Sequence, residues 1–171
     1  MSLESNYESA AWTRIYRLPY MVAMAMEGAG RSGVTGSANE RMAMVRGLAS
    51  GVKDFPENPL IRSIVQASGE ENQLLNVTSR TQDEILDCLT DIGIEDQSGL
   101  LKHLYAMVPT VLTDLGSRET SDTIEGYKTW VLNIAKGVAK AGKEGDFLGF
   151  GGEWFSAEER EIYKELMTLL F

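Results

Sequence analysis

Carboxylates gather towards the end of the sequence, around a glycine-rich segment: Glu144, Asp146, Glu153, Glu158 and Glu159. Hard divalent cations are bound by several carboxylate or carbonyl oxygens. The grouping therefore predicts a cation site that includes Glu144, Asp146, Glu158 and Glu159. The alternative is structural, because carboxylates in the first turn of a helix interact favourably with its dipole. That alternative would account for Glu158 and Glu159 without any ion.

One familiar cation motif is excluded in this segment. If Asp146 is aligned with the first position of an EF-hand loop, Gly151 falls on the glycine of that motif. The next ligand positions are then Leu148 and Phe150, and the last ligand position is Ala157. None of these side chains has the oxygen atoms that an EF-hand requires. A cation site here must therefore have a different arrangement of ligands.

The same segment carries aromatic side chains between its glycines. Phe147, Phe150, Trp154 and Phe155 lie close together in the sequence, and aromatic residues are favoured anchors in protein interfaces. These four residues predict a surface for a protein partner. The alternative is that the rings fold back over the core, with the glycines permitting tight turns.

The chain has one cysteine and one histidine, Cys88 and His103, which are the ingredients of a nucleophilic pair. No third group that would orient such a pair is evident. Both residues lie next to leucines, and Cys88 is expected to be a small buried side chain. The chain also lacks the Gly-x-Ser-x-Gly motif of hydrolases and a phosphate-binding loop. The sequence therefore predicts a protein that is not an enzyme.

Apolar residues recur at three- and four-residue intervals along most of the chain, the spacing of one helix face. The clearest example consists of Trp130, Val131, Ile134, Val138 and Ala141. Nothing alternates with a period of two over a useful length, so no sheet is expected. The sequence predicts an all-α fold, a compact bundle of about seven or eight helices in a single domain over residues 1–171.

Prolines and capping residues predict where the helices begin and end. Pro19 is expected to separate a helix over 9–17 from one over 19–29, and Pro109 to kink or divide the helix that Ser98 begins. Asn58 is expected to cap a short helix that starts at Pro59.

Capping boxes and glycines predict the remaining helix ends. Three capping boxes are expected to open helices, namely Ser37 with Glu40, Thr81 with Glu84, and Ser156 with Glu159. Gly142 and Gly145 are expected to end the helix that carries Trp130, because glycine adopts the left-handed backbone of a helix C-terminus at little cost.

The composition excludes several classes of function. The net charge of −9 and a pI near 4.7 argue against nucleic acid as a partner, since nucleic-acid binding needs a basic surface. A single cysteine excludes a scaffold of intramolecular disulfides. The first residues do not show the basic segment and apolar run of a signal peptide, so none is expected. No apolar run is long enough for a transmembrane segment. A cytoplasmic protein is expected.

Two regions of the chain resemble each other. Each consists of an apolar helix, a glycine stop, a loop, a Ser-x-x-Glu cap and a second helix, over residues of about 18–52 and 126–171. The string Ala29-Gly30-Arg31-Ser32-Gly33 aligns with Ala141-Gly142-Lys143-Glu144-Gly145, and Ser37-Ala38-Asn39-Glu40 aligns with Ser156-Ala157-Glu158-Glu159. The alternative is that any two helical hairpins share such features. The shared strings favour a two-fold internal pseudo-repeat.

These two hairpins resemble the TerB-like tellurite-resistance family. The resemblance implies an all-helical, internally duplicated domain and a cytoplasmic bacterial protein of tellurite resistance or stress response. It also implies a divalent-cation site with Glu144, Glu158 and Glu159 from the second copy and Glu40 from the first. The chain departs from the family pattern at Ser32 and Asn39, where acidic residues are expected.

Two functions follow from these observations. The first is a non-enzymatic tellurite-resistance or stress-response protein that binds a divalent cation through acidic loop and cap residues. The second is a helical protein-interaction or structural module that uses the aromatic-glycine loop and holds no ion.

Overall fold

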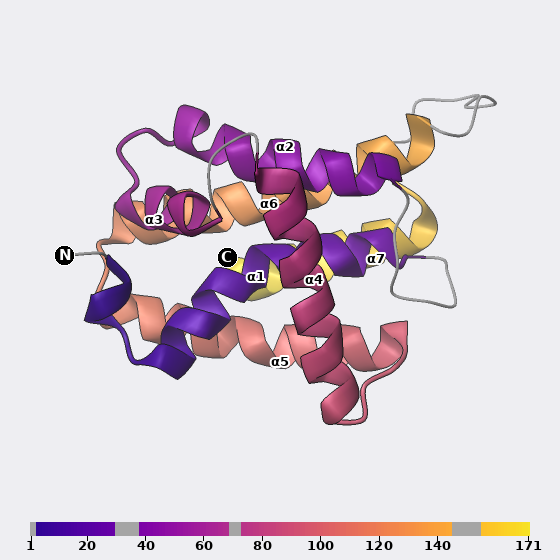
Figure 1. Cartoon of the computed structure of the whole chain (residues 1–171), viewed down its shortest axis with the longest axis horizontal. Helices are drawn as coiled ribbons and strands as arrows, with labels where there is room; N and C mark the ends of the chain where they lie inside the picture. The colour runs from indigo at the N-terminus through magenta and orange to yellow at the C-terminus, as the bar shows by residue number, and fades with distance from the viewer. Residues whose placement is uncertain (1–2, 30–37, 69–72, 145–154) are drawn as a thin grey trace.

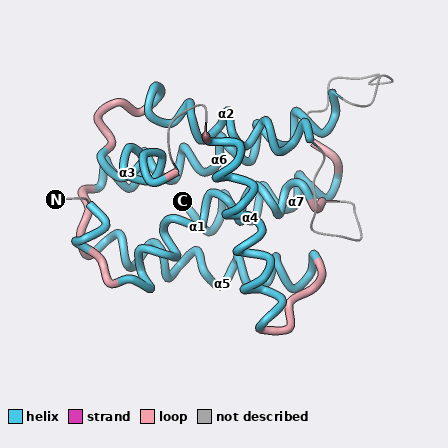
Figure 2. Tube along the Cα trace, in the orientation of Figure 1, coloured by secondary structure: helices cyan, strands magenta, loops and turns pink. Residues whose placement is uncertain are grey.

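The computed structural model describes residues 3–29, 38–68, 73–144 and 155–171 of the chain. This part contains a short 3-10 helix and seven α-helices: η1 (Leu3–Asn6), α1 (Ser9–Glu27), α2 (Ala38–Asp54), α3 (Pro59–Ala67), α4 (Leu74–Asp91), α5 (Gln97–Gly116), α6 (Ser121–Glu144) and α7 (Ala157–Leu170). Figure 2 shows helices joined by short loops and no strand in the described residues. The prediction of an all-α bundle is confirmed.

Helix α6 lies at the centre of the bundle. It packs mainly against α1 and α2 and also contacts α3, α5 and α7. In Figure 1, α2 and α6 lie side by side, and α4 crosses the bundle. The axes of α1, α5 and α7 are roughly aligned, with α1 antiparallel to the other two. The predicted apolar stripe of α6 is buried throughout: Trp130, Val131, Ile134, Val138 and Ala141. Burial of this stripe from water is the main driving force that holds α6 in place.

Two glycines let α2 approach α6 closely. The carbonyl of Gly47 accepts a hydrogen bond of 2.9 Å from the indole Nε1 of Trp130. A Cβ built on Gly51 would lie 2.8 Å from Cγ2 of Ile61 and even closer to the Trp130 indole. No side chain fits in that space, so Gly51 is required by packing and not by its backbone conformation.

The expected break at Pro19 is wrong, because α1 continues from Ser9 through Pro19 to Glu27. A proline inside a helix leaves the carbonyl four residues earlier without its usual N–H donor. Here that carbonyl belongs to Ile15, and the buried hydroxyl of Tyr127 donates a hydrogen bond of 2.7 Å to it. Because α6 supplies the missing donor, α1 remains a single helix. Burial also raises the pKa of Tyr127 well above its usual value, which keeps the hydroxyl protonated.

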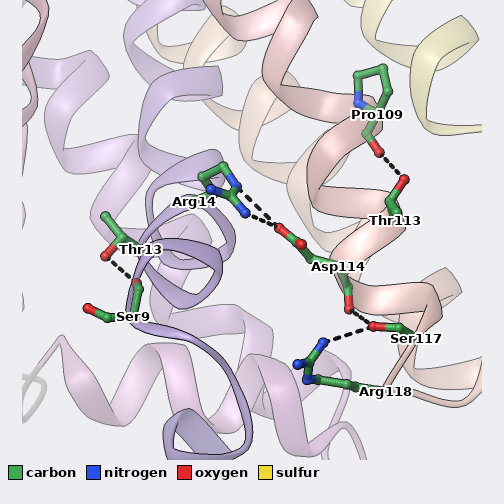
Figure 3. A network of polar contacts seen from close by, with 8 residues as sticks. All are labelled: Ser9, Thr13, Arg14, Pro109, Thr113, Asp114, Ser117 and Arg118. Carbon is green, nitrogen blue, oxygen red and sulfur yellow. Dashed lines mark hydrogen bonds and ion pairs between the residues drawn. The ribbon is translucent and has the colours of Figure 1, made fainter.

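Helix α5 likewise continues through Pro109, so of the two expected outcomes, a kink or a division, the division is wrong. The hydroxyl of Thr113 donates a hydrogen bond of 2.9 Å to the Pro109 carbonyl. One turn further on, Asp114 forms an ion pair of 2.8 Å with Arg14 of α1 (Figure 3). This ion pair and the apolar core hold α5 against α1 on both sides of the proline.

Some predicted helix starts are confirmed and others are wrong. Asn58 caps α3 through hydrogen bonds to the N–H groups of Leu60 and Ile61, as predicted. Thr81 does not open a helix, because α4 begins seven residues earlier and Thr81 is buried inside it. Ser98 is not the cap of α5, since Asp96 accepts a hydrogen bond of 2.7 Å from the Gly99 N–H.

The end of α6 also differs from the prediction. The helix continues past Gly142 to Glu144, and Gly145 lies outside the described residues. Ser37 lies outside them as well, so its capping box with Glu40 stays a prediction. The internal pseudo-repeat also stays a prediction.

Candidate functional site

Much of the predicted cation and aromatic segment lies outside the part of the chain that the structure describes. Asp146, Phe147, Phe150 and Trp154 belong to the undescribed residues 145–154. Glu144 is the last residue of α6, but its side chain is not described. The predicted site residues whose side chains are placed are therefore Glu40, Phe155, Glu158 and Glu159.

Glu159 belongs to a complete capping box at the start of α7, as the sequence predicts. Its carboxylate accepts a hydrogen bond of 2.6 Å from the Ser156 N–H, and the Ser156 hydroxyl accepts one of 3.2 Å from the Glu159 N–H. Glu159 is buried, with 7% of its surface exposed. Its carboxylate therefore serves the helix start in this structure.

Glu40 lies in the first turn of α2 and is also buried. A Cβ built on Gly142 of α6 would lie 2.9 Å from the Glu40 carboxylate. Glu40, from the first predicted repeat copy, therefore lies close to Gly142 of the second copy. Gly142 precedes Glu144 by two residues. Among the described residues, no three histidine, cysteine or acidic side chains are grouped so that they could hold a metal ion.

Phe155 packs back onto α7. Its ring lies 5.1 Å from the ring of Tyr163, centroid to centroid, and it is half-buried against the core. Phe155 therefore folds back over the core, which was the structural alternative to partner binding.

Glu158 leads to a larger feature, an open groove of about 600 Å³ where α1 ends and α5 and α7 begin. We call it the α5–α7 groove. The described residues that line it are Ala29, Gln97, Leu101, Tyr105, Ala157, Glu158, Glu161, Ile162 and Glu165. Helix α5 packs against both α1 and α7, and in Figure 1 it runs below these two helices.

The α5–α7 groove combines an apolar floor with acidic side chains. Leu101, Tyr105 and Ile162 pack with the core and form the floor. The carboxylates of Glu158, Glu161 and Glu165 all come from α7 and are exposed. Burial, and to a lesser extent the charge of Glu165, raises the pKa of Tyr105, so this phenol stays neutral in the groove.

Sequence reasoning identified only Glu158 among these groove residues. The signal for the others was present on α7, where Glu158, Glu161 and Glu165 follow one another at three- and four-residue intervals and so share one side of the helix. No comparable signal on α5 indicated that Leu101 and Tyr105 face α7, because that contact joins segments far apart in the chain.

A second cavity, of about 120 Å³, lies between α1, α4 and α5. Cys88 and His103 both line it, and Arg17 donates a hydrogen bond of 3.6 Å to the Cys88 sulfur. The expectation that Cys88 is buried is wrong, because its side chain is exposed. The reason is that the apolar face of α4 that meets the core contains Ile85 and Leu89, and Cys88 lies beside that face.

The exposure of Cys88 makes its thiol accessible in the folded protein. We expect Ellman's reagent to modify one thiol per chain without denaturant, since the chain has one cysteine and reactivity requires access. The Cys88→Ser variant should give no signal and is the control. A thiol that reacts only after unfolding would contradict the placement of Cys88.

None of the described helices is long and apolar enough to cross a membrane. No family model matches the chain, and neither a curated protein nor a solved structure shows significant similarity to it.

Proposed function

We propose that this protein is a non-enzymatic protein-interaction module and that the α5–α7 groove holds an amphipathic helix of a partner protein. The observation that carries this proposal is the apolar floor of Leu101, Tyr105 and Ile162 in a groove that, among the described residues, is open between α5 and α7. The axes of these two helices are roughly aligned in Figure 1. Helix-in-groove recognition uses such a surface, because the apolar face of the incoming helix is removed from water along the groove.

In its described residues, the groove offers little that would favour anion binding. One N–H group at the start of each helix, α5 and α7, is engaged by a cap: Asp96 accepts from the Gly99 N–H, and Ser156 accepts from the Glu159 N–H. Among the described residues that line it, the ionisable side chains are Tyr105 and three glutamates. The described lining contains no lysine, arginine or histidine, so it has no cationic side chain that would stabilise an anionic transition state.

The resemblance to the TerB-like family is compatible with this function. It implies a binding or scaffold component of tellurite resistance or stress response in the bacterial cytoplasm, and an interaction module would be the part of that response that recruits another protein. The groove supplies a concrete surface for this role, at the end of the bundle where the second predicted repeat copy places α7.

A groove-filling variant tests the proposal. Ala157 is an exposed groove residue at the first position of α7, so Ala157→Trp fills the groove without disturbing the core. We would measure fluorescence anisotropy with synthetic amphipathic helical peptides of one apolar face and of positive, neutral or negative net charge. Binding of at least one peptide should weaken about tenfold or more in this variant.

The control is Met167→Trp, which adds the same ring to another exposed residue of α7 that does not line the groove. This variant should bind like the unmodified protein. Failure of every peptide to bind, or equal binding by Ala157→Trp and Met167→Trp, would refute the proposed function.

A divalent-cation site is the second candidate, and the contact of Glu40 with Gly142 favours it. Gly142 lies in the last turn of α6, two residues before Glu144. Calorimetric titration of chelator-treated protein with calcium, magnesium, manganese and zinc tests it. One-site binding that disappears in Glu144→Gln would support the site, whereas absence of heat from every ion would refute it.

A further inference from the structure

We infer that the helix bound in the α5–α7 groove is basic, with lysine or arginine residues at three- and four-residue intervals beside its apolar face. This inference rests on the proposed function and adds the charge and spacing of the partner. The structural basis is the alignment of Glu158, Glu161 and Glu165 along the edge of the apolar floor.

The spacing of the three glutamates sets the spacing of the partner's charges. At about 1.5 Å of rise per residue, Glu158 and Glu165 are separated by roughly 10 Å along α7. A helix that packs nearly parallel or antiparallel to α7 presents its own residues at the same intervals. Three basic side chains at such intervals would therefore each meet one carboxylate while the adjacent apolar residues enter the groove.

The carboxylates are available for such contacts. In the part of the chain that the structure describes, Glu161 pairs with Lys164 at 3.1 Å, and the two side chains are 74% and 62% exposed. An ion pair this exposed contributes little, because water screens it. A basic side chain of the partner can therefore replace Lys164 as the ion-pair partner of Glu161 at little cost in free energy. The new ion pair would lie beside the apolar floor, which partly excludes water.

The charge pattern disfavours the other occupants of an apolar groove. A second copy of this chain would bring its own α7 glutamates towards those of the first, and the net charge of −9 on each chain would oppose association. An anionic membrane surface would be repelled in the same way. An acidic helix would place like charges along the whole contact, which is unfavourable.

Two sets of neutralising substitutions separate a local effect from one of net charge. The groove variant is Glu158→Gln, Glu161→Gln and Glu165→Gln. Its control is Asp83→Asn, Glu84→Gln and Asp87→Asn on α4, which removes the same number of negative charges from exposed positions outside the groove. Glu158 also lies in the first turn of α7, so the pair Glu161→Gln and Glu165→Gln is measured as well, because it leaves the helix start unchanged.

The probes are three fluorescent synthetic helical peptides. One is amphipathic with leucine on one face and lysine beside it, one has glutamate in place of lysine, and one contains the residues of the basic peptide in scrambled order. The basic amphipathic peptide should bind most tightly to the unmodified protein. Its affinity should fall on the order of tenfold in the groove variant and less than about twofold in the α4 control.

Salt provides an independent readout. The screening length falls from about 10 Å at 0.1 M salt to about 3 Å at 1 M, so the preference for the basic over the acidic peptide should shrink as salt is added.

Equal binding of the basic and acidic peptides, with loss of both in Ala157→Trp, would overturn this inference and leave the proposed function standing. Binding of the scrambled peptide as tight as that of the amphipathic one, or equal losses in the groove and α4 variants, would show non-specific attraction and would also overturn it. No binding by any peptide would overturn both.

Discussion

Replacing Gly51 by alanine is expected to destabilise the protein by about 2 kcal/mol. The added methyl group would lie 2.8 Å from Cγ2 of Ile61 and would overlap the indole of Trp130. Both neighbours are buried, with 0% and 1% of their surfaces exposed, and the indole is held by its hydrogen bond to Gly47. Movement of Ile61 would open the contact between α2 and α3, and movement of Trp130 would open that between α2 and α6. The free energy of unfolding from urea denaturation measures the effect.

The matched control is Gly137→Ala on α6, the same chemical change at a helical glycine where a Cβ would meet nothing within 4 Å. Alanine is favoured over glycine inside a helix by about 0.5–1 kcal/mol, so this variant should be slightly more stable. The two substitutions are therefore expected to have opposite signs. Equal stabilisation by both would show that α2 and α6 are further apart than the structure places them.

Replacing Tyr127 by phenylalanine is expected to cost about 1–3 kcal/mol. The substitution removes one oxygen atom and leaves the Ile15 carbonyl in the core without the hydrogen bond that Tyr127 donates. The intrahelical N–H donor is absent because residue 19 is proline. The cost arises from a buried acceptor without a partner, and the ring itself still fills its place. Thermal and urea unfolding would both report the loss.

Pro19→Ala provides the test of this mechanism, because alanine restores the N–H that bonds to the Ile15 carbonyl in an ordinary helix. In the Pro19→Ala background, Tyr127→Phe should cost less than about 1 kcal/mol, and the double-mutant cycle should give a clear coupling energy. If Tyr127→Phe costs the same amount in both backgrounds, the hydroxyl does not compensate for the proline.

The parts of the fold that sequence reasoning predicted correctly depend on local patterns. The apolar stripe around Trp130 and Ile134 lies on one helix face, and burial follows from that spacing. The caps at Asn58 and Ser156 involve residues within one turn, so their chemistry can be read directly from the sequence. The helical class of the fold follows from the same periodicity.

The wrong predictions depend on contacts between distant residues. Pro19 was expected to break α1, but the donor that compensates for it comes from Tyr127 on α6. Thr81 and Glu84 match the sequence pattern of a capping box, yet both lie inside α4. The buried face of this helix begins at Leu74 and extends past Thr81 to Ile85. A short motif cannot show whether the chain on either side continues as helix.

The candidate site was predictable only in part. The acidic character of the start of α7 is evident from Glu158 and Glu159, although the structure gives these neighbours different roles, one in the groove and one in the cap. The apolar floor required Leu101 and Tyr105 of α5 to face α7. That arrangement is a property of tertiary packing, which the spacing within either helix does not determine.

The most direct test of the α5–α7 groove as a binding surface is a map of amide chemical shifts in the full chain as the basic amphipathic peptide is added. The largest changes should fall on residues 97–105 of α5 and 157–165 of α7, with saturation at one peptide per chain. Changes concentrated at the cavity between Phe55 and Gly126, or at the cavity that Cys88 lines, would contradict the account, as would unchanged shifts at saturating peptide.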